Sequence, residues 1–238
     1  ETPNLERMAA QGVKLTSFYV PTPYCPPSRA TILTGRYPFH NGVVHNPAPD
    51  AGINEVGLAA SEITIAESLK PAGYATSCIG KWHLGHTLKY LPRTQGFDEY
   101  YFHYPQPADK VVERALAMLD RHDDKRFFMF LHFFDAHDPY DPPAPYDTMF
   151  CPFGEKECLR KEYKSPVKAF LGERRRPTDR DIQGSTALYD GEIRFVDEEL
   201  SVFFERLKEL DLWENTMVVV TSDHGEEFWD HRSLSHGF

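Results

Sequence analysis

Hydrophobic and polar residues alternate along the chain with two different periods. Residues 3–12 place Leu5, Met8 and Ala9 on one helical face and end at Gly12. Residues 13–20, which are rich in β-branched and aromatic side chains, predict a strand. Helical and extended segments continue to alternate after this point. The pattern therefore predicts an α/β fold.

Further elements are bounded by clear stop signals. Residues 63–74 predict a helix ended by Pro71 and Gly73, and residues 111–122 predict an amphipathic helix. Residues 126–134 form a continuous apolar run, typical of a strand buried on both faces. The remaining expected elements are a short helix at 28–35, strands at 75–80 and 216–225, a long helix at 184–212, and a long loop or insertion at 141–182.

Composition narrows the class of protein. The chain has 238 residues, of which 41% are hydrophobic and 13% aromatic, as in a folded globular domain. A net charge of -10 argues against nucleic-acid binding, because no basic stripe offsets it. No apolar run reaches the ~18 residues of a membrane span. Because the sequence opens and stops in mid-pattern, we interpret it as part of a longer protein.

The four cysteines differ in their surroundings. Cys151 and Cys158 bracket a short loop, which is compatible with a disulfide in an oxidising compartment or with two free thiols. Cys78 lies in an expected strand and is interpreted as a core residue. Cys25 is followed by two prolines, a serine and an arginine, a setting more typical of a reactive residue than of a packed one.

Polar clusters follow three of the expected strands. They are GKWHLG at residues 80–85, DAHDPY at 135–140 and SDHG at 222–225. Open α/β sheets bind their ligands at the carboxyl ends of the strands. We therefore expect these three segments to contribute to one site.

The first two clusters carry candidate catalytic groups. Lys81 and His83 are two residues apart and point the same way in an extended segment, which suits anion binding and protonation of a leaving group. Trp82 then points to the other face and is interpreted as a packing residue. His137 precedes an Asp-Pro-Tyr turn and is a better site candidate than His132, which we interpret as a satisfied core histidine.

The third cluster offers metal ligands. Asp223 and His224 supply a carboxylate and an imidazole, but most metal ions need further ligands. Asp230 and His231 follow nearby and are equally well explained by an exposed loop.

The stretch around Cys25 predicts an anion site. Pro26 and Pro27 stiffen the turn, and Ser28 is expected to cap the helix that follows. Cys25 would then lie near a helix N-terminus, with Arg29 as a fixed cation beside it. A tetrahedral anion such as phosphate or sulfate fits this arrangement.

These residues resemble a known family. CPPSRATILTGR at 25–36 resembles the signature of type I sulfatases, in which Cys-x-Pro-Ser-Arg is followed by Leu-Thr-Gly-Arg. Residues 2–20 and the motifs GKWHLG, HDPY and TSDHG resemble further family blocks in the same order, from Thr2 to Gly237. The resemblance implies an alkaline-phosphatase-like sandwich with a mostly parallel central sheet and helices on both faces. Residues 1–238 would be part of its catalytic domain, without the N-terminal strand and the C-terminal part.

The resemblance also implies a mechanism. In sulfatases the signature cysteine is oxidised by a maturation enzyme to formylglycine, whose hydrate carries a hydroxyl that attacks sulfur while a second hydroxyl later expels sulfate. Cys25 would be that precursor. The resemblance also implies that Arg29 stabilises the formylglycine and the metal-binding carboxylates and that Lys81 binds the sulfate. It implies that His83 contacts the diol and that His137 contacts the sulfate or protonates the leaving group. Asp223, His224 and residue 25 would bind the cation.

Two departures from the family pattern affect the metal and sulfate sites. The Asp-Asp pair of the family's first strand would precede Glu1, and an expected lysine corresponds to His236 or lies beyond Phe238. His236 is therefore a candidate for sulfate binding. The resemblance implies calcium, whereas His224 in place of an asparagine leaves manganese or zinc open.

The leading hypothesis is hydrolysis of the sulfate ester of a small molecule or glycan. The alternatives are a phosphonate monoester or phosphodiester hydrolase of the same superfamily, and a binding module that holds a sulfated glycan without turnover. GKWHLG favours the sulfatase, and the retained Cys25, Arg29, Lys81 and His137 argue against a decayed site. The localisation stays open, with a periplasmic or secreted protein favoured by the spacing of Cys151 and Cys158.

Overall fold

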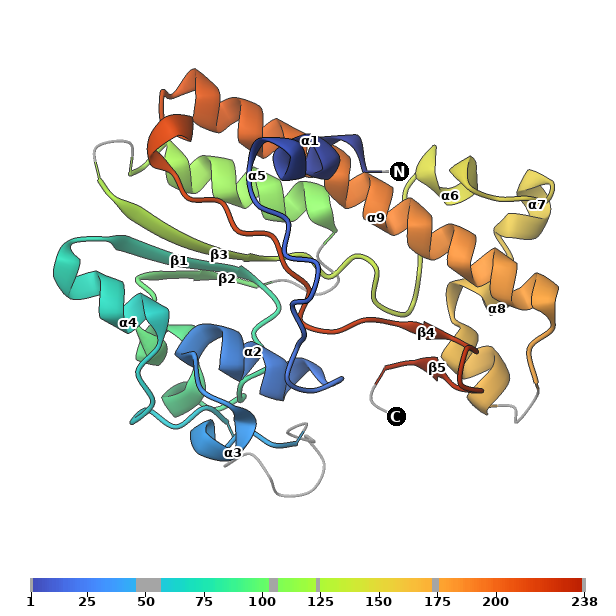
Figure 1. Ribbon diagram of the computed structural model, residues 1–238, viewed down its shortest axis with the longest axis horizontal. Helices are drawn as coiled ribbons and strands as arrows, with labels where there is room; N and C mark the ends of the chain where they lie inside the picture. The colour runs from blue at the N-terminus through green and yellow to red at the C-terminus, as the bar shows by residue number, and fades with distance from the viewer. Residues whose placement is uncertain (1, 46–56, 103–106, 123–124, 173–175, 237–238) are drawn as a thin grey trace.

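A parallel sheet lies at the centre of the fold. The computed structural model describes residues 2–45, 57–102, 107–122, 125–172 and 176–236 (Figure 1). The described three-stranded sheet has the order β2-β1-β3, and both pairings are parallel. Its strands are β1 (Ala75–Gly80), β2 (Glu99–Tyr101) and β3 (Phe127–His132). Cys78 of β1 is in register with Tyr100 and with Phe130.

Helices cover both faces of this sheet. Alternate side chains of a strand point to opposite faces, so Ile79 packs in a cluster with α5 (Ala108–Leu119) and α9 (Asp179–Glu209). Cys78 packs on the other face with α2 (Cys25–Thr34) and α4 (Ile65–Leu69). Figure 1 shows α5 and α9 above the sheet and α2 and α4 below it. This layering agrees with the predicted α/β fold, and Cys78 is fully buried as expected.

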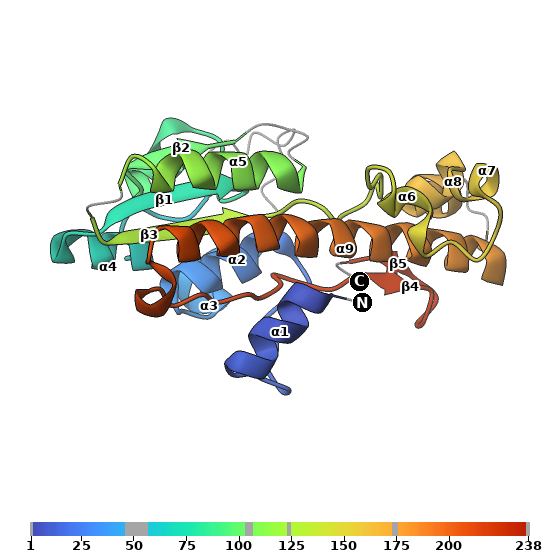
Figure 2. The same cartoon turned by 90° about the horizontal axis from the view of Figure 1, so that it is seen from above.

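Side chains fix the start of two helices. Thr64 and Glu67 form a reciprocal capping box at α4, and Thr178 and Asp181 form another at α9. The other helices are α1 (Pro3–Gln11), α3 (Pro38–Asn41), α6 (Tyr146–Met149), α7 (Glu155–Cys158), α8 (Lys161–Lys164), η1 (Lys70–Ala72), η2 (Leu88–Tyr90), η3 (Pro92–Gln95), η4 (Val167–Gly172) and η5 (Trp213–Asn215). Figure 2 shows that α9 begins beside the short helices α6, α7 and α8 and that its C-terminal half lies along the sheet.

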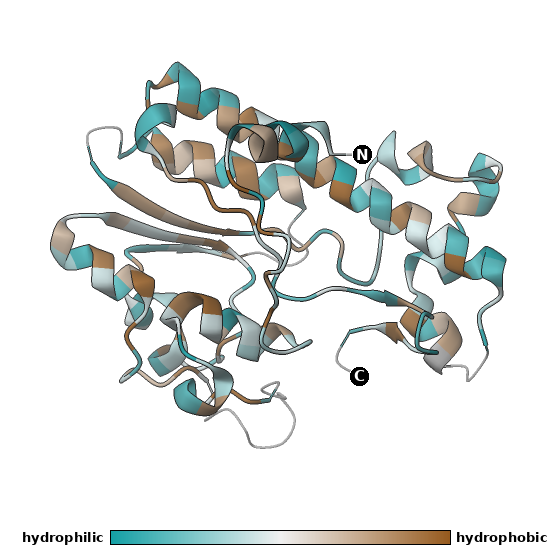
Figure 3. Cartoon of the chain, viewed as in Figure 1, coloured by the Kyte–Doolittle hydropathy of each residue, from teal (hydrophilic) through white to brown (hydrophobic). Residues whose placement is uncertain are grey.

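Two expected strands are absent from the described structure. Residues 13–20 and 216–225 are extended or turning segments that pair with no described strand. Val13 is 86% exposed and Met217 is 90% exposed, although Figure 3 colours the first part of the extended segment before β4 as hydrophobic. A strand needs a hydrogen-bonding neighbour as well as a suitable sequence, and the described residues supply none here. The strand prediction is therefore wrong for both segments.

Two other expectations need correction. β3 is half-buried along its length rather than buried on both faces, because β1 is the one strand paired with it in the described sheet. Residues 141–182 contain α6, α7, α8 and η4 rather than a long loop.

A disulfide joins Cys151 and Cys158, whose Cα atoms are 6.1 Å apart. The described C-terminal hairpin pairs β4 (Glu227–Phe228) with β5 (Leu234–Ser235), and none of the described helices could cross a membrane.

Candidate active site

Cys25 occupies the first position of α2. Tyr24 precedes it in an extended conformation, and Pro26 fits the first turn because no amide hydrogen is needed there. The expectation that Ser28 caps the helix is wrong, since its hydroxyl donates to the Thr22 carbonyl at 3.3 Å. Cys25 is only 3% exposed. Its sulfur therefore lies in a sheltered position at the positive end of the helix dipole.

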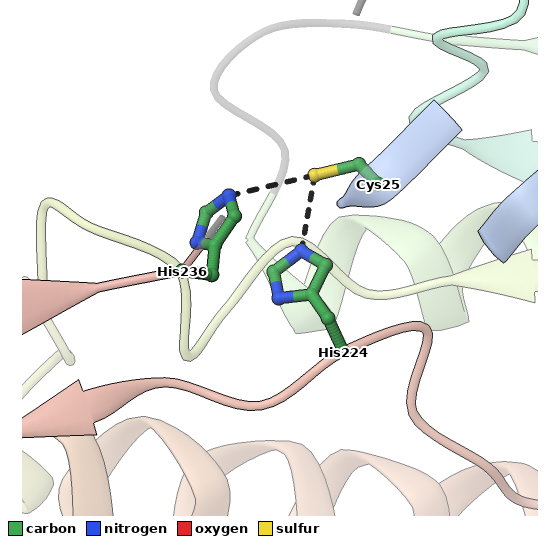
Figure 4. Close-up of side chains that lie close together, drawn as sticks. All are labelled: Cys25, His224 and His236. Atoms are coloured by element: carbon green, nitrogen blue, oxygen red, sulfur yellow. Dashed lines mark hydrogen bonds between the residues drawn. The ribbon is translucent and has the colours of Figure 1, made fainter. Parts of the chain in front are cut away.

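Three cationic or imidazole side chains surround this sulfur. His224 Nε2 lies 3.0 Å from Cys25 Sγ, His236 Nε2 lies 3.7 Å from it, and Lys81 Nζ donates to it at 3.4 Å (Figure 4). The two imidazole rings stack with centroids 3.9 Å apart. Lys81 and His224 come from two of the three polar clusters, which meet here as expected, and His236 comes from a third segment outside those clusters.

His83 and His137 also lie next to the sulfur of Cys25. Burial raises the pKa of the Cys25 thiol, but hydrogen bonds with His137, His224, His236 and His83 together bring it far below its usual range. His137 Nδ1 bonds to the Asp138 carbonyl at 2.7 Å, which fixes the ring. The thiolate is therefore the favoured form of residue 25.

The loop after β1 brings Lys81 and His83 to residue 25. The prediction that both point the same way rested on an extended segment, whereas His83 has a left-handed backbone conformation. Gly80 has φ 105°, and a Cβ atom there would lie 2.0 Å from the His132 carbonyl oxygen. Only glycine therefore fits this close approach. His83 itself has φ 58°, and Trp82 is buried at 3% exposure in the core, as predicted.

Arg29 joins this loop to α2. It is fully buried, and its Nε donates to the Trp82 carbonyl at 2.8 Å while Nη2 donates to the Lys81 carbonyl. Its Nη1 lies 3.7 Å from Asp223 Oδ2. Arg29 therefore orients the segment that carries Lys81 and places a fixed positive charge beside Asp223.

Asp223 faces the Arg29 guanidinium and two imidazole rings. Its Oδ2 lies 3.6 Å from His132 Nε2, and its Oδ1 lies 3.7 Å from His224 Nε2. Burial raises the pKa of Asp223, but His132, Arg29 and His224 more than offset this and hold it well below its usual range. Oδ2 is buried and has no hydrogen-bond partner. A buried carboxylate oxygen without a hydrogen-bond partner is a suitable ligand for a metal cation.

His132 belongs to the site, which the sequence interpretation missed. Its Nδ1 is buried without a hydrogen-bond partner, so it is not a satisfied core histidine. Burial and the nearby Arg29 lower the pKa of His132 to about 4, despite the Asp223 carboxylate. The available signal was its place as the last residue of β3, at the carboxyl edge of the sheet.

Glu226 and Tyr140 were also missed. Glu226 Oε1 accepts a hydrogen bond from His236 Nδ1 at 2.7 Å, and Glu226 Oε2 accepts one from the Tyr140 hydroxyl at 3.1 Å. Burial lowers the pKa of His236, but Cys25 and Glu226 raise it to about 9 overall. Each residue adjoins a recognised motif, since Tyr140 ends DAHDPY and Glu226 follows SDHG. His231, by contrast, has an 87% exposed side chain.

The donor atoms fit a divalent cation in part. The Asp223 carboxylate and the His224 imidazole are adjacent, and the sulfur of Cys25 lies 3.0 Å from that ring. Calcium takes 6–8 oxygen ligands, and Asp223 is the one carboxylate that the described residues place beside Arg29 and His224. The described residues therefore do not complete a calcium site by themselves.

The fold and this site define the family of the chain. The family model for sulfatases matches residues 1–237, and the chain belongs to that family. The chain is 31% identical over 252 aligned positions to human N-acetylgalactosamine-6-sulfatase, with 94% of the chain and 45% of that relative covered. It thus spans about half the length of this curated relative.

Solved structures share the fold. The phosphonate monoester hydrolase SpPMH from Silicibacter pomeroyi has a TM-score of 0.77 and 24% identity, covering 98% of this chain and 60% of its own. A protein solved in complex with its substrate D-glucosamine-2-N,6-O-disulfate has a TM-score of 0.68 and 20% identity, with coverage of 98% and 62%. These similarities confirm the predicted α/β, alkaline-phosphatase-like fold.

Proposed function

We propose that the full protein hydrolyses a sulfate ester, with residue 25 acting after oxidation of Cys25 to formylglycine. The observation that carries this proposal is the convergence of Lys81, His83, His137 and His224 on the sulfur of Cys25. A buried cluster of cationic and imidazole side chains suits the tetrahedral anionic group of a sulfate ester and the negative charge of its transition state. The sulfatase family to which the chain belongs supports the same reaction.

The surrounding side chains would divide the work. The modified residue supplies a hydroxyl that attacks sulfur, and Lys81 binds the sulfate oxygens. His83 holds the hydrated residue 25, and His137 contacts sulfate or protonates the leaving oxygen. His236, held by Glu226, presents Nε2 toward the same centre and provides a positive charge where the family pattern has a lysine.

A divalent cation would be held by Asp223, His224 and residue 25. The support is the buried Oδ2 of Asp223, which has no hydrogen-bond partner. A cation there supplies electrostatic stabilisation of the oxygen atoms on sulfur. Arg29 lies 3.7 Å from the same oxygen and favours the ionised form of Asp223. We propose calcium as the ion, with manganese or zinc as the alternatives that His224 leaves open.

The substrate class we propose is a sulfated small molecule or sulfated glycan. One neighbour of the same fold is solved with a sulfated glucosamine as its substrate. A formylglycine-generating maturation enzyme would be the partner that modifies Cys25. The disulfide between Cys151 and Cys158 supports a periplasmic or secreted location.

Peptide mass spectrometry across Cys25 tests the proposal on full-length protein produced with the maturation enzyme. We expect a mass loss of about 18 Da, distinct from the mass gains of ordinary cysteine oxidation. The same preparation should hydrolyse aryl sulfates faster than phosphonate monoesters. A modified residue with higher phosphonate turnover would assign the protein to phosphonate hydrolysis, and a modified residue without turnover would indicate a binding module.

A further inference from the structure

The unmodified site contains a second possible ligand set, different from that proposed for the sulfatase cation. Cys25 Sγ, His224 Nε2 and His236 Nε2 all lie within 4.8 Å of one another. Sulfur and imidazole nitrogen are soft or borderline ligands, which favour zinc over calcium. Asp223 is not needed in this set. His236 takes its place as a ligand.

The two distances from the sulfur are close to those of a tetrahedral zinc ion. With Zn–S of about 2.3 Å and Zn–N of about 2.0 Å, a tetrahedral site separates sulfur and nitrogen by about 3.5 Å. The two observed separations from Cys25 Sγ are 3.0 Å to His224 and 3.7 Å to His236, on either side of this value. Figure 4 shows both rings directing a nitrogen toward the sulfur. A tetrahedral site also needs about 3.3 Å between the two nitrogens. The two Nε2 atoms lie within 4.8 Å of each other on stacked rings, so zinc binding would turn the two rings toward a common point.

The outer hydrogen bonds of the two histidines are an independent indication. His224 Nδ1 bonds to the Gly225 carbonyl at 3.0 Å, and His236 Nδ1 bonds to the buried carboxylate of Glu226 at 2.7 Å. Each acceptor requires hydrogen on Nδ1, which leaves Nε2 as the metal-facing atom. Histidine ligands in metal sites almost always have such a partner, which fixes their tautomer and orientation.

The charges near the sulfur also permit a cation. Asp223 and Glu226 provide negative charge, while Lys81 and Arg29 provide positive charge. Zinc would displace any proton on the Cys25 sulfur and on His236 Nε2. A fourth ligand would be a water molecule. Conversion of Cys25 to formylglycine removes the sulfur, so this ligand set exists only in the unmodified protein.

We propose that the protein binds one zinc ion through Cys25, His224 and His236 while residue 25 is still a thiol. The bound ion caps the sulfur and distinguishes the unmodified state from the modified one. The zinc site requires the Cys25 thiol but not sulfatase activity. The zinc proposal can therefore fail while the proposed sulfatase function stands, and the proposed function can fail while the zinc proposal stands.

The test uses full-length protein produced without the maturation enzyme, with the thiol verified by intact mass. Zinc titration against a chromophoric chelator should give one site per chain. Cobalt in place of zinc should give a thiolate-to-metal charge-transfer band and the visible absorption of a tetrahedral ion. This spectrum is measured on the unaltered protein, so it does not depend on whether a variant folds.

Variants then assign the ligands. Cys25→Ser and His236→Ala should each weaken zinc binding at least ~100-fold, since loss of an outer partner alone typically weakens metal binding 10–100-fold. His231→Ala is the matched control, because this exposed histidine lies in the same hairpin, and it should change nothing. Absence of stoichiometric binding, a cobalt spectrum without a thiolate band, or binding unchanged by Cys25→Ser in folded protein would overturn the proposal.

Discussion

Glu192 offers a sharp test of how buried charge limits the stability of this fold. It lies on α9 and is 5% exposed, and its Oε1 accepts a hydrogen bond from the Asp141 amide at 2.7 Å. Burial and the neighbouring Asp135 carboxylate raise the pKa of Glu192 to about 8. Burial likewise raises the pKa of Asp135, whose Oδ1 accepts from the Ala108 amide at 3.2 Å. Two acids with raised pKa values therefore lie near each other between α9 and the loop that carries His137, and the protonated form of Glu192 is favoured.

The direction of the effect follows from proton linkage. The ordinary pKa of 4.5 applies to the unfolded chain, so the folded protein binds more protons between about pH 4.5 and about pH 8. The free energy of unfolding therefore falls as the pH rises through this window. The difference between the ordinary pKa of 4.5 and the pKa of about 8 corresponds to at most about 5 kcal/mol.

Glu192→Gln removes this ionisation and keeps the acceptor oxygen. We expect the variant to match the parent protein at about pH 5 and to be more stable by about 2–4 kcal/mol at about pH 9. Urea unfolding at both pH values gives the two differences. Glu205→Gln is the control on the same helix, because that carboxylate is 58% exposed and should show no growing advantage. An equal effect of Glu192→Gln at both pH values would refute the reasoning.

Three further predictions concern single positions. Cys25→Ala in the full-length protein should abolish sulfate ester turnover, whereas Cys78→Ala should retain it and lose about 1–2 kcal/mol of stability, as measured by paired assays and urea unfolding. Arg29→Met should lower stability by about 3–5 kcal/mol in urea unfolding, because it leaves a buried carboxylate without its cation, and a change below about 1 kcal/mol would contradict that role. Gly191→Ala should lower the free energy of unfolding by about 1–3 kcal/mol, measured by thermal unfolding, because its Cβ would lie 2.4 Å from a backbone oxygen of α6. Gly154→Ala is the control and should cause no such loss, since a Cβ there would have nothing within 4 Å.

Local patterns predicted the elements that carry their own signals. The apolar stripe of α5 and the buried run of β1 needed no knowledge of distant residues. Residues 216–225 have the same apolar pattern as a strand, but pairing depends on a neighbour that local sequence does not specify. The tight packing of Gly191 against α6 is similarly invisible, because helix propensity alone disfavours glycine there.

The candidate site was predictable where motifs recur and not where packing decides. Resemblance to the family identified Cys25, Lys81 and His224 as candidates, and the structure brings them together. His132 and Glu226 became visible only when distances were known. The end of β3 for His132 and the neighbouring SDHG motif for Glu226 were weak signals, because histidine and glutamate are common at such positions without any role in a site.

The position of His236 depends on Glu226 and on the aromatic side chains packed behind it. Glu226 holds its ring, and Tyr140 holds Glu226 with a hydroxyl that is itself fully buried. Tyr140 packs edge-on against Tyr189 of α9, with ring centroids 5.6 Å apart, and lies 5.7 Å from the Phe228 ring of β4. The helix that covers the sheet thus also anchors the residue that faces Cys25. Because packed aromatic contacts yield little to small displacements, the position of this imidazole follows from the packing of α9 rather than from its own short hairpin.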